Sequence, residues 1–422
     1  MFVVPNTPFE YSVLFFLQLS VILSACKAVG WVAKYFGQPQ VVAEMIAGVF
    51  LGPSLLGLVA PETYQMIFPE GSRRILFSVS QVGLSLYMFI VGVEFRADHF
   101  LNKGKTAVAV SVSGMLTPFV LGSILAIWLH AEGTLFPSEV TLYQAMLFMG
   151  ASMCITAFPM LARIIVENGL SGTVLGTLAI AAAAIDDVAA WCVLAIVVSS
   201  KDGNWLSAIT AIGGGIVYAM FVLGILRPIL RYLTKSAEEQ GVLNANLVSL
   251  ILLLVMLGAF TTDRIGVYAV FGAFLMGCAM PRGNISDQIR LQFEPLTIGL
   301  LLPLFFTYSG LNTRLDLVSS PRLIGIAIVV LAVSSLGKGV ACWAAARLCG
   351  ESSSTSIAIG ALMNARGLME LILLNIAKEK GLIGPELFSI LVVMAIVTTL
   401  AATPVFRMVQ RAFAEESPAL HR

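Results

Sequence analysis

Thirteen long apolar segments follow one another along the chain, and they restrict the folds that it can adopt. They lie at about 11–33, 40–59, 75–94, 106–129, 141–165, 172–199, 205–230, 243–261, 265–280, 295–311, 322–347, 354–377 and 385–409. A helix needs roughly 20 apolar residues to cross a bilayer. The segments lack the period-2 alternation of membrane β-strands. We therefore expect an all-α polytopic membrane protein with about 13 transmembrane helices.

The composition excludes a water-soluble enzyme. Of 422 residues, 58% are hydrophobic and only 12% are charged, whereas a soluble domain carries about 25% charged residues. The formal net charge is +1, so no basic face predicts a nucleic-acid partner. The six cysteines lie in or beside apolar segments without CxxC spacing, which argues against a disulfide framework or a zinc site. The lipid bilayer is the expected surrounding of this chain.

The distribution of positive charge predicts the orientation. With alternate crossings, the side that holds the C-terminus receives 15 of the 25 Lys and Arg residues and the other side 8, with two inside spans. Because Lys and Arg gather on the cytoplasmic side, we expect the N-terminus outside and the C-terminus in the cytoplasm, in an inner or plasma membrane. The first segment is expected to remain as a span. The tail is short, and no soluble regulatory domain is expected.

Two adjacent acids lie at the midpoint of segment 172–199. Asp186 and Asp187 each cost about 2.5–3.5 kcal/mol at that depth on insertion scales. A buried structural pair, satisfied by neighbours or protonated, is one interpretation. An ion or proton site is the one that we favour. Adjacent helical residues point about 100° apart, so one acid can face an aqueous cavity while the other meets a partner inside the protein.

Lys338 is the expected partner of one of these acids. It lies mid-span in segment 322–347, between Gly337 and Gly339. A buried ammonium beside a carboxylate can exchange its proton when a competing cation arrives. A static salt bridge is the alternative interpretation.

Segment 141–165 is expected to be a broken helix. Pro159 frees the carbonyl of Ile155 from its helical hydrogen bond, and Thr156 adds a hydroxyl at the same level. Irregular backbone at membrane depth persists only where it lines a cavity or is buried in protein. An ordinary kinked helix is the alternative for Pro159 alone.

Segment 354–377 is the second expected broken helix, because Asn364, Arg366 and Glu370 interrupt an apolar run. The two breaks fall at the fifth position of each half of the chain, and such paired breaks mark the substrate site of inverted-repeat transporters.

For the other polar residues within the spans, a structural role is a simpler explanation than ion binding. Arg366 and Glu370 are four residues apart and can pair on one helix face, and Arg163 can also reach Glu370. We expect these to be structural rather than ion-binding. Glu44, beside Pro39, can line a cavity or cap its helix.

Six stretches together resemble the monovalent cation:proton antiporter-2 family. They are QPQVVAEMIAGVFLGPSLLG (38–57), LYMFIVGVEF (86–95), ITAFPMLARII (155–165), AIDDVAAW (184–191), GKGVACWAAARLCG (337–350) and MNARGLMELILLNIA (363–377). The resemblance covers nearly the whole chain and keeps the order and spacing of the motifs.

The resemblance implies one transmembrane antiporter domain over residues 1–422. Its two inverted repeats would span about 11–199 and 243–409 and be linked by helix 205–230. The crossed, discontinuous helices would lie in a core domain, and a separate dimerisation domain would form a homodimer.

The resemblance also implies roles for individual residues. Asp187 would be the essential carboxylate for cation and proton, Asp186 would pair with Lys338, and both acids with Thr156 would hold the ion. Ile155, Pro159, Asn364, Arg366 and Glu370 would support the crossed helices. Two acids plus a lysine resemble the electrogenic sodium/proton members, whereas potassium-efflux members carry a glutamine at the position of Asp186.

The expected function is therefore secondary active exchange of Na⁺ or Li⁺ for protons by alternating access, without a cofactor. Potassium/proton exchange and sodium-coupled symport of an organic anion are the alternatives. Symport needs an additional substrate pocket. An intramembrane aspartyl protease needs carboxylates that face each other from separate helices, and the chain has neither a GxGD stretch nor the TVGYG filter of potassium channels.

Overall fold

The computed structural model describes residues 7–38, 40–94, 100–158, 161, 164–165, 168–170, 173–201, 205–240 and 243–416. The chain forms two compact units. Unit 1 comprises Met1–Trp31, Glu44–Arg96 and Asp202–Leu311, and unit 2 comprises Val32–Ala43, Ala97–Lys201 and Asn312–Arg422. Each unit therefore draws on both halves of the sequence.

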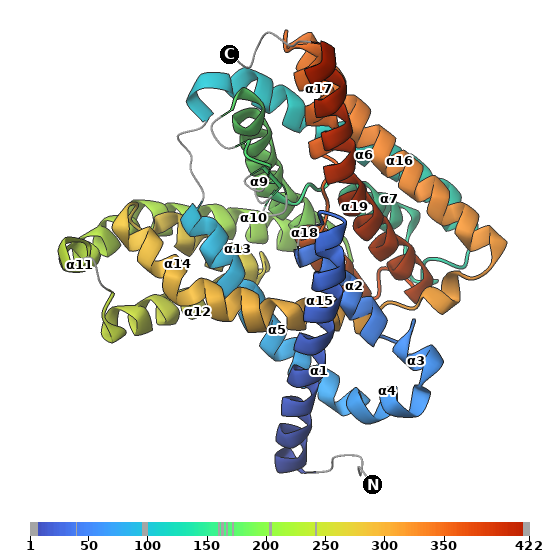
Figure 1. Cartoon of the computed structure of the whole chain (residues 1–422), viewed down its shortest axis with the longest axis horizontal. Helices are drawn as coiled ribbons and strands as arrows, with labels where there is room; N and C mark the ends of the chain where they lie inside the picture. Colours follow the sequence, from blue (N-terminus) through green and yellow to red (C-terminus); the bar gives the residue numbers. More distant parts are fainter. Residues whose placement is uncertain are drawn as a thin grey trace. The chain divides into compact units, whose positions relative to one another are not determined.

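Unit 1 holds two clusters of buried apolar side chains, and its helices are drawn in Figure 1. Its elements are α1 (Pro8–Tyr35), most of α2 (Gln40–Leu51), α3 (Leu56–Val59), α4 (Pro61–Ile67), α5 (Glu70–Glu94), α10 (Trp205–Met220), η2 (Phe221–Leu226), α11 (Arg227–Gln240), α12 (Ala245–Ile265), α13 (Ala269–Ala279), α14 (Asn284–Leu296), η3 (Thr297–Leu301) and α15 (Leu302–Leu311). Helices α5 and α13 pack closely, because Gly92 and Gly277 face each other there and a Cβ on either would overlap backbone of the other helix.

Unit 2 contains the helices that carry the polar residues singled out in the sequence. Its elements are α6 (Phe100–Ala131), α7 (Leu142–Cys154), α9 (Val174–Lys201), η4 (Leu315–Val318), α16 (Pro321–Leu348), α17 (Ser353–Leu362), α18 (Leu368–Glu379) and α19 (Pro385–Glu416). Helix α6 packs against α7, α9 and α16. Helix α16 packs in addition against α17 and α19 (Figure 1).

All thirteen predicted segments contain a helix, which confirms the all-α fold class. In the described chain ten helices are long and apolar enough to cross a membrane. The other three segments hold the shorter helices α7, α13 and α17, so the count of thirteen crossing helices is not confirmed. The inverted repeats and the dimerisation domain stay predictions.

Both expected helix breaks are present. Helix α7 ends at Cys154 because Ile155 adopts an extended conformation, with φ −69° and ψ 134°, and residues 155–157 are not helical. Pro159, to which the sequence attributes this break, lies outside the described residues. In segment 354–377, α17 ends at Leu362 and α18 begins after Gly367, whose φ of 152° favours a residue without Cβ.

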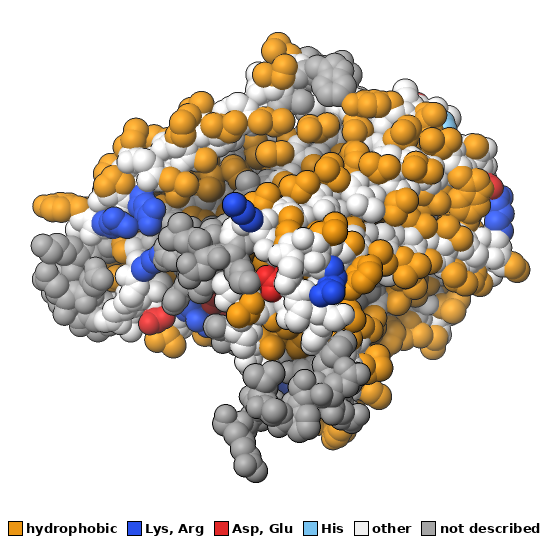
Figure 2. Space-filling view, turned by 90° about the horizontal axis from the view of Figure 1, so that it is seen from above, with side chains coloured by type: hydrophobic (Ala, Val, Ile, Leu, Met, Phe, Trp, Pro, Cys, Tyr) orange, Lys and Arg blue, Asp and Glu red, His pale blue; other side chains and the backbone are white. Residues whose placement is uncertain are grey.

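The surface of the chain is that of a protein surrounded by lipid. Hydrophobic side chains cover most of the face in Figure 2, with few charged groups among them. Large apolar side chains point outward even on single helices, such as Phe9, Phe16 and Trp31 on α1. A contiguous exposed apolar surface of this kind indicates a membrane or an interface rather than water.

Candidate functional site

Asp186 and Asp187 lie near the middle of α9, in an alanine-rich stretch of small side chains. Small residues allow neighbouring helices to approach closely. The two side chains are buried, with exposed fractions of 0% and 2%. Because a buried carboxylate is costly unless it is compensated, the surroundings of each acid show what it can do.

Asp186 is surrounded by donors from two other helices and from the non-helical stretch after α7. The Ser111 hydroxyl on α6 donates to Oδ1 over 2.6 Å, and the Thr156 hydroxyl donates to Oδ2 over 2.5 Å. The Lys338 ammonium on α16 lies 3.3 Å from Oδ2. Both carboxylate oxygens of Asp186 therefore accept hydrogen bonds, and Asp186 donates none.

Lys338 is fully buried and its side chain does not reach the surface of the chain. Besides Asp186, its Nζ donates to the carbonyl of Gly114 over 3.0 Å and to the carbonyl of Cys154 at the end of α7. An ammonium has three protons to donate, and each has an acceptor here. The arrangement is the ion pair expected from the sequence.

Asp187 has different surroundings. Among the described residues, neither of its carboxylate oxygens has a hydrogen-bond partner. A buried polar group without a partner requires an explanation. An incoming ion or proton would supply the missing partner, so Asp187 is the side chain of this pair best placed to exchange ligands.

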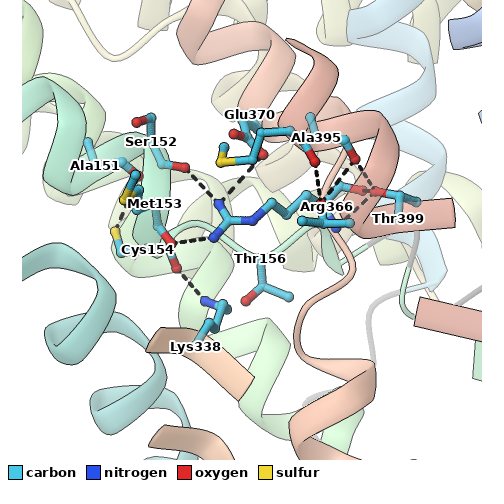
Figure 3. A network of polar contacts seen from close by, with 12 residues as sticks. Ala151, Ser152, Met153, Cys154, Thr156, Lys338, Arg366, Glu370, Ala395 and Thr399 are labelled. Carbon is cyan, nitrogen blue, oxygen red and sulfur yellow. Dashed lines mark hydrogen bonds and ion pairs between the residues drawn. The ribbon is translucent and has the colours of Figure 1, made fainter. Parts of the chain in front are cut away.

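Arg366 joins the two broken helices (Figure 3). Its guanidinium donates to the carbonyls of Ser152 and Met153, over 2.7 and 2.6 Å, which are near the negative end of the α7 dipole. Its carbonyl accepts from the Thr399 hydroxyl over 2.6 Å, and Glu370 lies 3.6 Å from the guanidinium. This fully buried guanidinium therefore compensates the C-terminal end of α7.

The backbone also connects the two breaks directly. The N–H of Ala157, just after α7, donates to the carbonyl of Ala365 over 3.1 Å. Both residues lie in non-helical backbone, where such groups lack the intrahelical partner. The breaks in segments 141–165 and 354–377 thus meet within unit 2.

Asn364 attaches the second break to the helix that carries Lys338. Its amide donates to the carbonyls of Ser335 and Gly360, over 3.1 and 3.2 Å. A Cβ at Gly339 would overlap the Asn364 amide, and a Cβ at Gly360 would overlap the Gly339 carbonyl. These two glycines permit the close packing of α16 against α17.

The structure brings Thr156, Ile155, Asp186, Asp187, Lys338, Asn364, Arg366 and Glu370 together in unit 2. Pro159 and Arg163 lie outside the described residues. Glu44 is buried in α2 and belongs to unit 1. Ser111, Gly114 and Thr399 also contact these residues and were not predicted from the sequence. A single hydroxyl or glycine in an apolar helix gives no sequence signal, because each is compatible with an ordinary span.

Residues 20–411 match the family model described as "Sodium/hydrogen exchanger, transmembrane". The chain belongs to this family. Membership was expected from the six stretches and from the paired acids, and it is confirmed. The chain is accordingly an integral membrane protein of a cation:proton antiporter family.

Three relatives of the chain are all named as antiporters, but their names give different cations. The chain is 37% identical to Na(+)/H(+) antiporter NhaS4 of Synechocystis, over 91% of this chain and 94% of that protein. It is 33% identical to Cation/H(+) antiporter 17 of Arabidopsis thaliana and 30% identical to K(+)/H(+) antiporter 1 of Saccharomyces cerevisiae, over 94% and 95% of its own length. It spans about half the length of these two relatives, 49% and 47%.

The fold of the family is also found in a solved structure. The sodium proton antiporter MjNhaP1 from Methanocaldococcus jannaschii, determined at pH 8, superposes with a TM-score of 0.64. The match covers 95% of this chain and 97% of that one at 14% identity. At this level of identity, the similarity shows that the two chains share a fold.

Proposed function

We propose that the chain exchanges a monovalent cation, Na⁺ or Li⁺, for protons across the membrane. The observation that carries the proposal is the contrast between the two acids. Asp186 is fully engaged with donors, while both oxygens of buried Asp187 lack partners among the described residues. A carboxylate in that position can take either a proton or a cation.

Cation binding at Asp187 is supported by the oxygen atoms nearby. Hard cations take oxygen ligands, by extension of the preferences of Ca²⁺ and Mg²⁺. Asp186, the Thr156 hydroxyl and the backbone oxygens of residues 155–157, where α7 has ended, are the additional ligands that we assign. Water from an aqueous cavity would complete the shell.

Coupling to protons would use both acids and Lys338. In the proton-loaded form Asp187 is protonated and Lys338 is charged beside Asp186. A cation that binds Asp187 displaces its proton, and the new positive charge beside the ion pair favours release of the Lys338 proton. Release of two protons for one cation would make exchange electrogenic. Moving each net charge across a membrane potential of 100 mV changes the free energy by about 2.3 kcal/mol.

Alternating access would expose this one site to each side in turn. We propose that a core containing the broken helices moves against a dimerisation domain in a homodimer. The N-terminus outside and the C-terminus in the cytoplasm complete the proposed arrangement. The transporter would need no cofactor.

Potassium/proton exchange is the second candidate, because a relative 30% identical to this chain is named a K(+)/H(+) antiporter. The two acids favour Na⁺ or Li⁺, because in having both acids and the lysine the chain resembles the electrogenic sodium/proton members of the family, whereas its potassium-efflux members have glutamine in place of the first acid. Sodium-coupled symport of an organic anion is a more distant alternative.

Cation-driven proton flux in proteoliposomes tests the proposal, with Na⁺, Li⁺ and K⁺ added separately under clamped and varied membrane potential. We expect a flux with Na⁺ or Li⁺ that depends on the potential. Asp187→Asn should abolish it with thermal stability unchanged, whereas the matched control Asp287→Asn, on α14, should behave as the wild type. Flux retained in Asp187→Asn would disprove the mechanism. An equal or larger response to K⁺ would favour the second candidate.

A further inference from the structure

One long helix of unit 1 changes from apolar to basic near its end. Helices α10, η2 and α11 follow one another without a break over residues 205–240, and the stretch Ile209–Leu233 is long and apolar enough to cross a membrane. Arg227 and Arg231 lie in the last two turns of that stretch, and the polar sequence TKSAEEQ follows it. Both arginines are within about 10 Å of its end along the helix axis. Their long side chains can therefore reach the headgroup region of a bilayer.

Packing determines which side of α11 faces away from the protein. Leu230 is fully buried in an apolar cluster with Ile289 of α14, the helix against which α11 packs (Figure 1). The outward side carries Ile225, Ile229 and Tyr232, with exposed fractions of 55%, 47% and 80%. These three positions are four and three residues apart and share a helix face. An exposed apolar face beside two arginines offers contacts to both parts of a lipid, its acyl chains and its headgroup.

Arg227 is half-buried at the edge of this face and has no counter-charge from the chain. Its Nε is buried and, in the part of the chain that the structure describes, has no hydrogen-bond partner. None of the ion pairs among the described residues includes Arg227. By contrast, Nε of Arg290 on the neighbouring helix α14 lies 2.9 Å from Glu94 and 3.3 Å from Glu294. Because a buried donor without an acceptor is costly, a negatively charged acceptor from outside the chain would stabilise Arg227.

We propose that Arg227 and Arg231 bind the headgroup of an anionic phospholipid. A guanidinium can hold a phosphate through two parallel N–H···O bonds, and Arg231, one turn beyond Arg227, lies on the same side of the helix. One acyl chain of the lipid lies along the exposed face of Ile225, Ile229 and Tyr232, which a free phosphate would leave uncovered. The site is formed by unit 1 alone, and its occupancy does not depend on the proposed exchange of cations and protons.

The test measures lipid binding by native mass spectrometry of the purified full chain in detergent. Phosphatidylglycerol and phosphatidylcholine with identical acyl chains are added separately, so that the two probes differ only in the headgroup. We expect the wild type to bind phosphatidylglycerol more tightly, and Arg227→Gln to bind it about fivefold more weakly, from the contribution of one basic residue to the binding of anionic lipid. Arg227→Lys keeps the charge and should recover part of the loss. Arg264→Gln, at an exposed position in the last turn of α12, is the matched control and should bind as the wild type does.

Equal binding of the two lipids by the wild type, or undiminished binding of phosphatidylglycerol by Arg227→Gln, would overturn the inference. Inorganic phosphate that displaces phosphatidylglycerol at equal concentration would also overturn it, since the site would then recognise phosphate without the lipid. If Arg227→Gln does not fold, Arg231→Gln tests the same site, because Arg231 is exposed; binding equal to that of the wild type would refute the inference there. The measurement needs no transport, so a chain that fails to exchange cations defeats the proposed function and leaves this test decisive.

Discussion

Removal of the Lys338 charge is the perturbation whose stability effect follows most directly from the structure. Lys338→Met keeps an unbranched side chain, one heavy atom shorter, and removes an ammonium that is fully buried. The ammonium donates to Asp186 and to two backbone carbonyls. The variant leaves Asp186 as a buried charge with only two hydroxyl donors.

Breaking a buried ion pair by removing one partner costs about 3–5 kcal/mol. Because the hydroxyls of Ser111 and Thr156 still compensate Asp186 in part, we expect a loss near the lower limit, about 3 kcal/mol in the free energy of unfolding. Adding Asp186→Asn removes the uncompensated charge. Coupling energies between contacting residues are about 0.5–3 kcal/mol, so the double variant should recover about 2 kcal/mol of the loss.

The assay is chemical unfolding in detergent of the wild type, both single variants and the double variant. Lys380→Met, an exposed lysine on the chain just after α18, is the matched control and should leave the unfolding free energy unchanged. Strictly additive losses in the double variant, or a Lys338→Met protein as stable as the wild type, would refute the conclusion that the two charges compensate each other in the folded chain.

Two further substitutions probe the join between the broken helices. Arg366→Ala removes the donors to the carbonyls of Ser152 and Met153 and should lower the free energy of unfolding by about 3 kcal/mol, with Arg366→Lys losing less; equal losses in the two variants would contradict a role of the charge. Gly360→Ala inserts a Cβ against the carbonyl of Gly339 and should cost about 1–3 kcal/mol through overpacking, measured as thermal unfolding in detergent. The control is Ser353→Ala, at an exposed position on α17, and it should leave the melting temperature unchanged. An alanine substitution at the exposed Gly350 is a poorer control, because the φ of 86° at that position favours glycine.

The sequence predicted those parts of the structure that membrane burial makes costly. Charged groups are so unfavourable in a bilayer that Asp186, Asp187, Lys338 and Arg366 are identified by their position alone, and all four are buried together in unit 2. The existence of a helix in every segment was predictable because backbone polar groups in a bilayer must form their hydrogen bonds within the segment. The number of crossing helices stays a prediction, because α7 and α13, with 13 and 11 residues, are each shorter than a helix that spans a bilayer.

The contacts of Ser111 and Gly114 were beyond prediction for a different reason. Serine and glycine are common in membrane helices at interhelical contacts of no chemical consequence. Whether such a residue meets a carboxylate depends on the rotation of α6 about its axis relative to α9 and α16. That rotation is fixed by tertiary packing, here at Gly114 and Cys342, and not by the pattern of apolar residues.

Proton release on cation binding tests the central claim most directly, since it asks whether one buried carboxylate exchanges a proton for a cation. The measurement is the amount of H⁺ released when Na⁺ is added to weakly buffered, detergent-solubilised protein, with choline as the ionic-strength control. We predict release from the wild type and none from Asp187→Asn. Sodium binding without proton release, or equal release from the variant, would contradict the account.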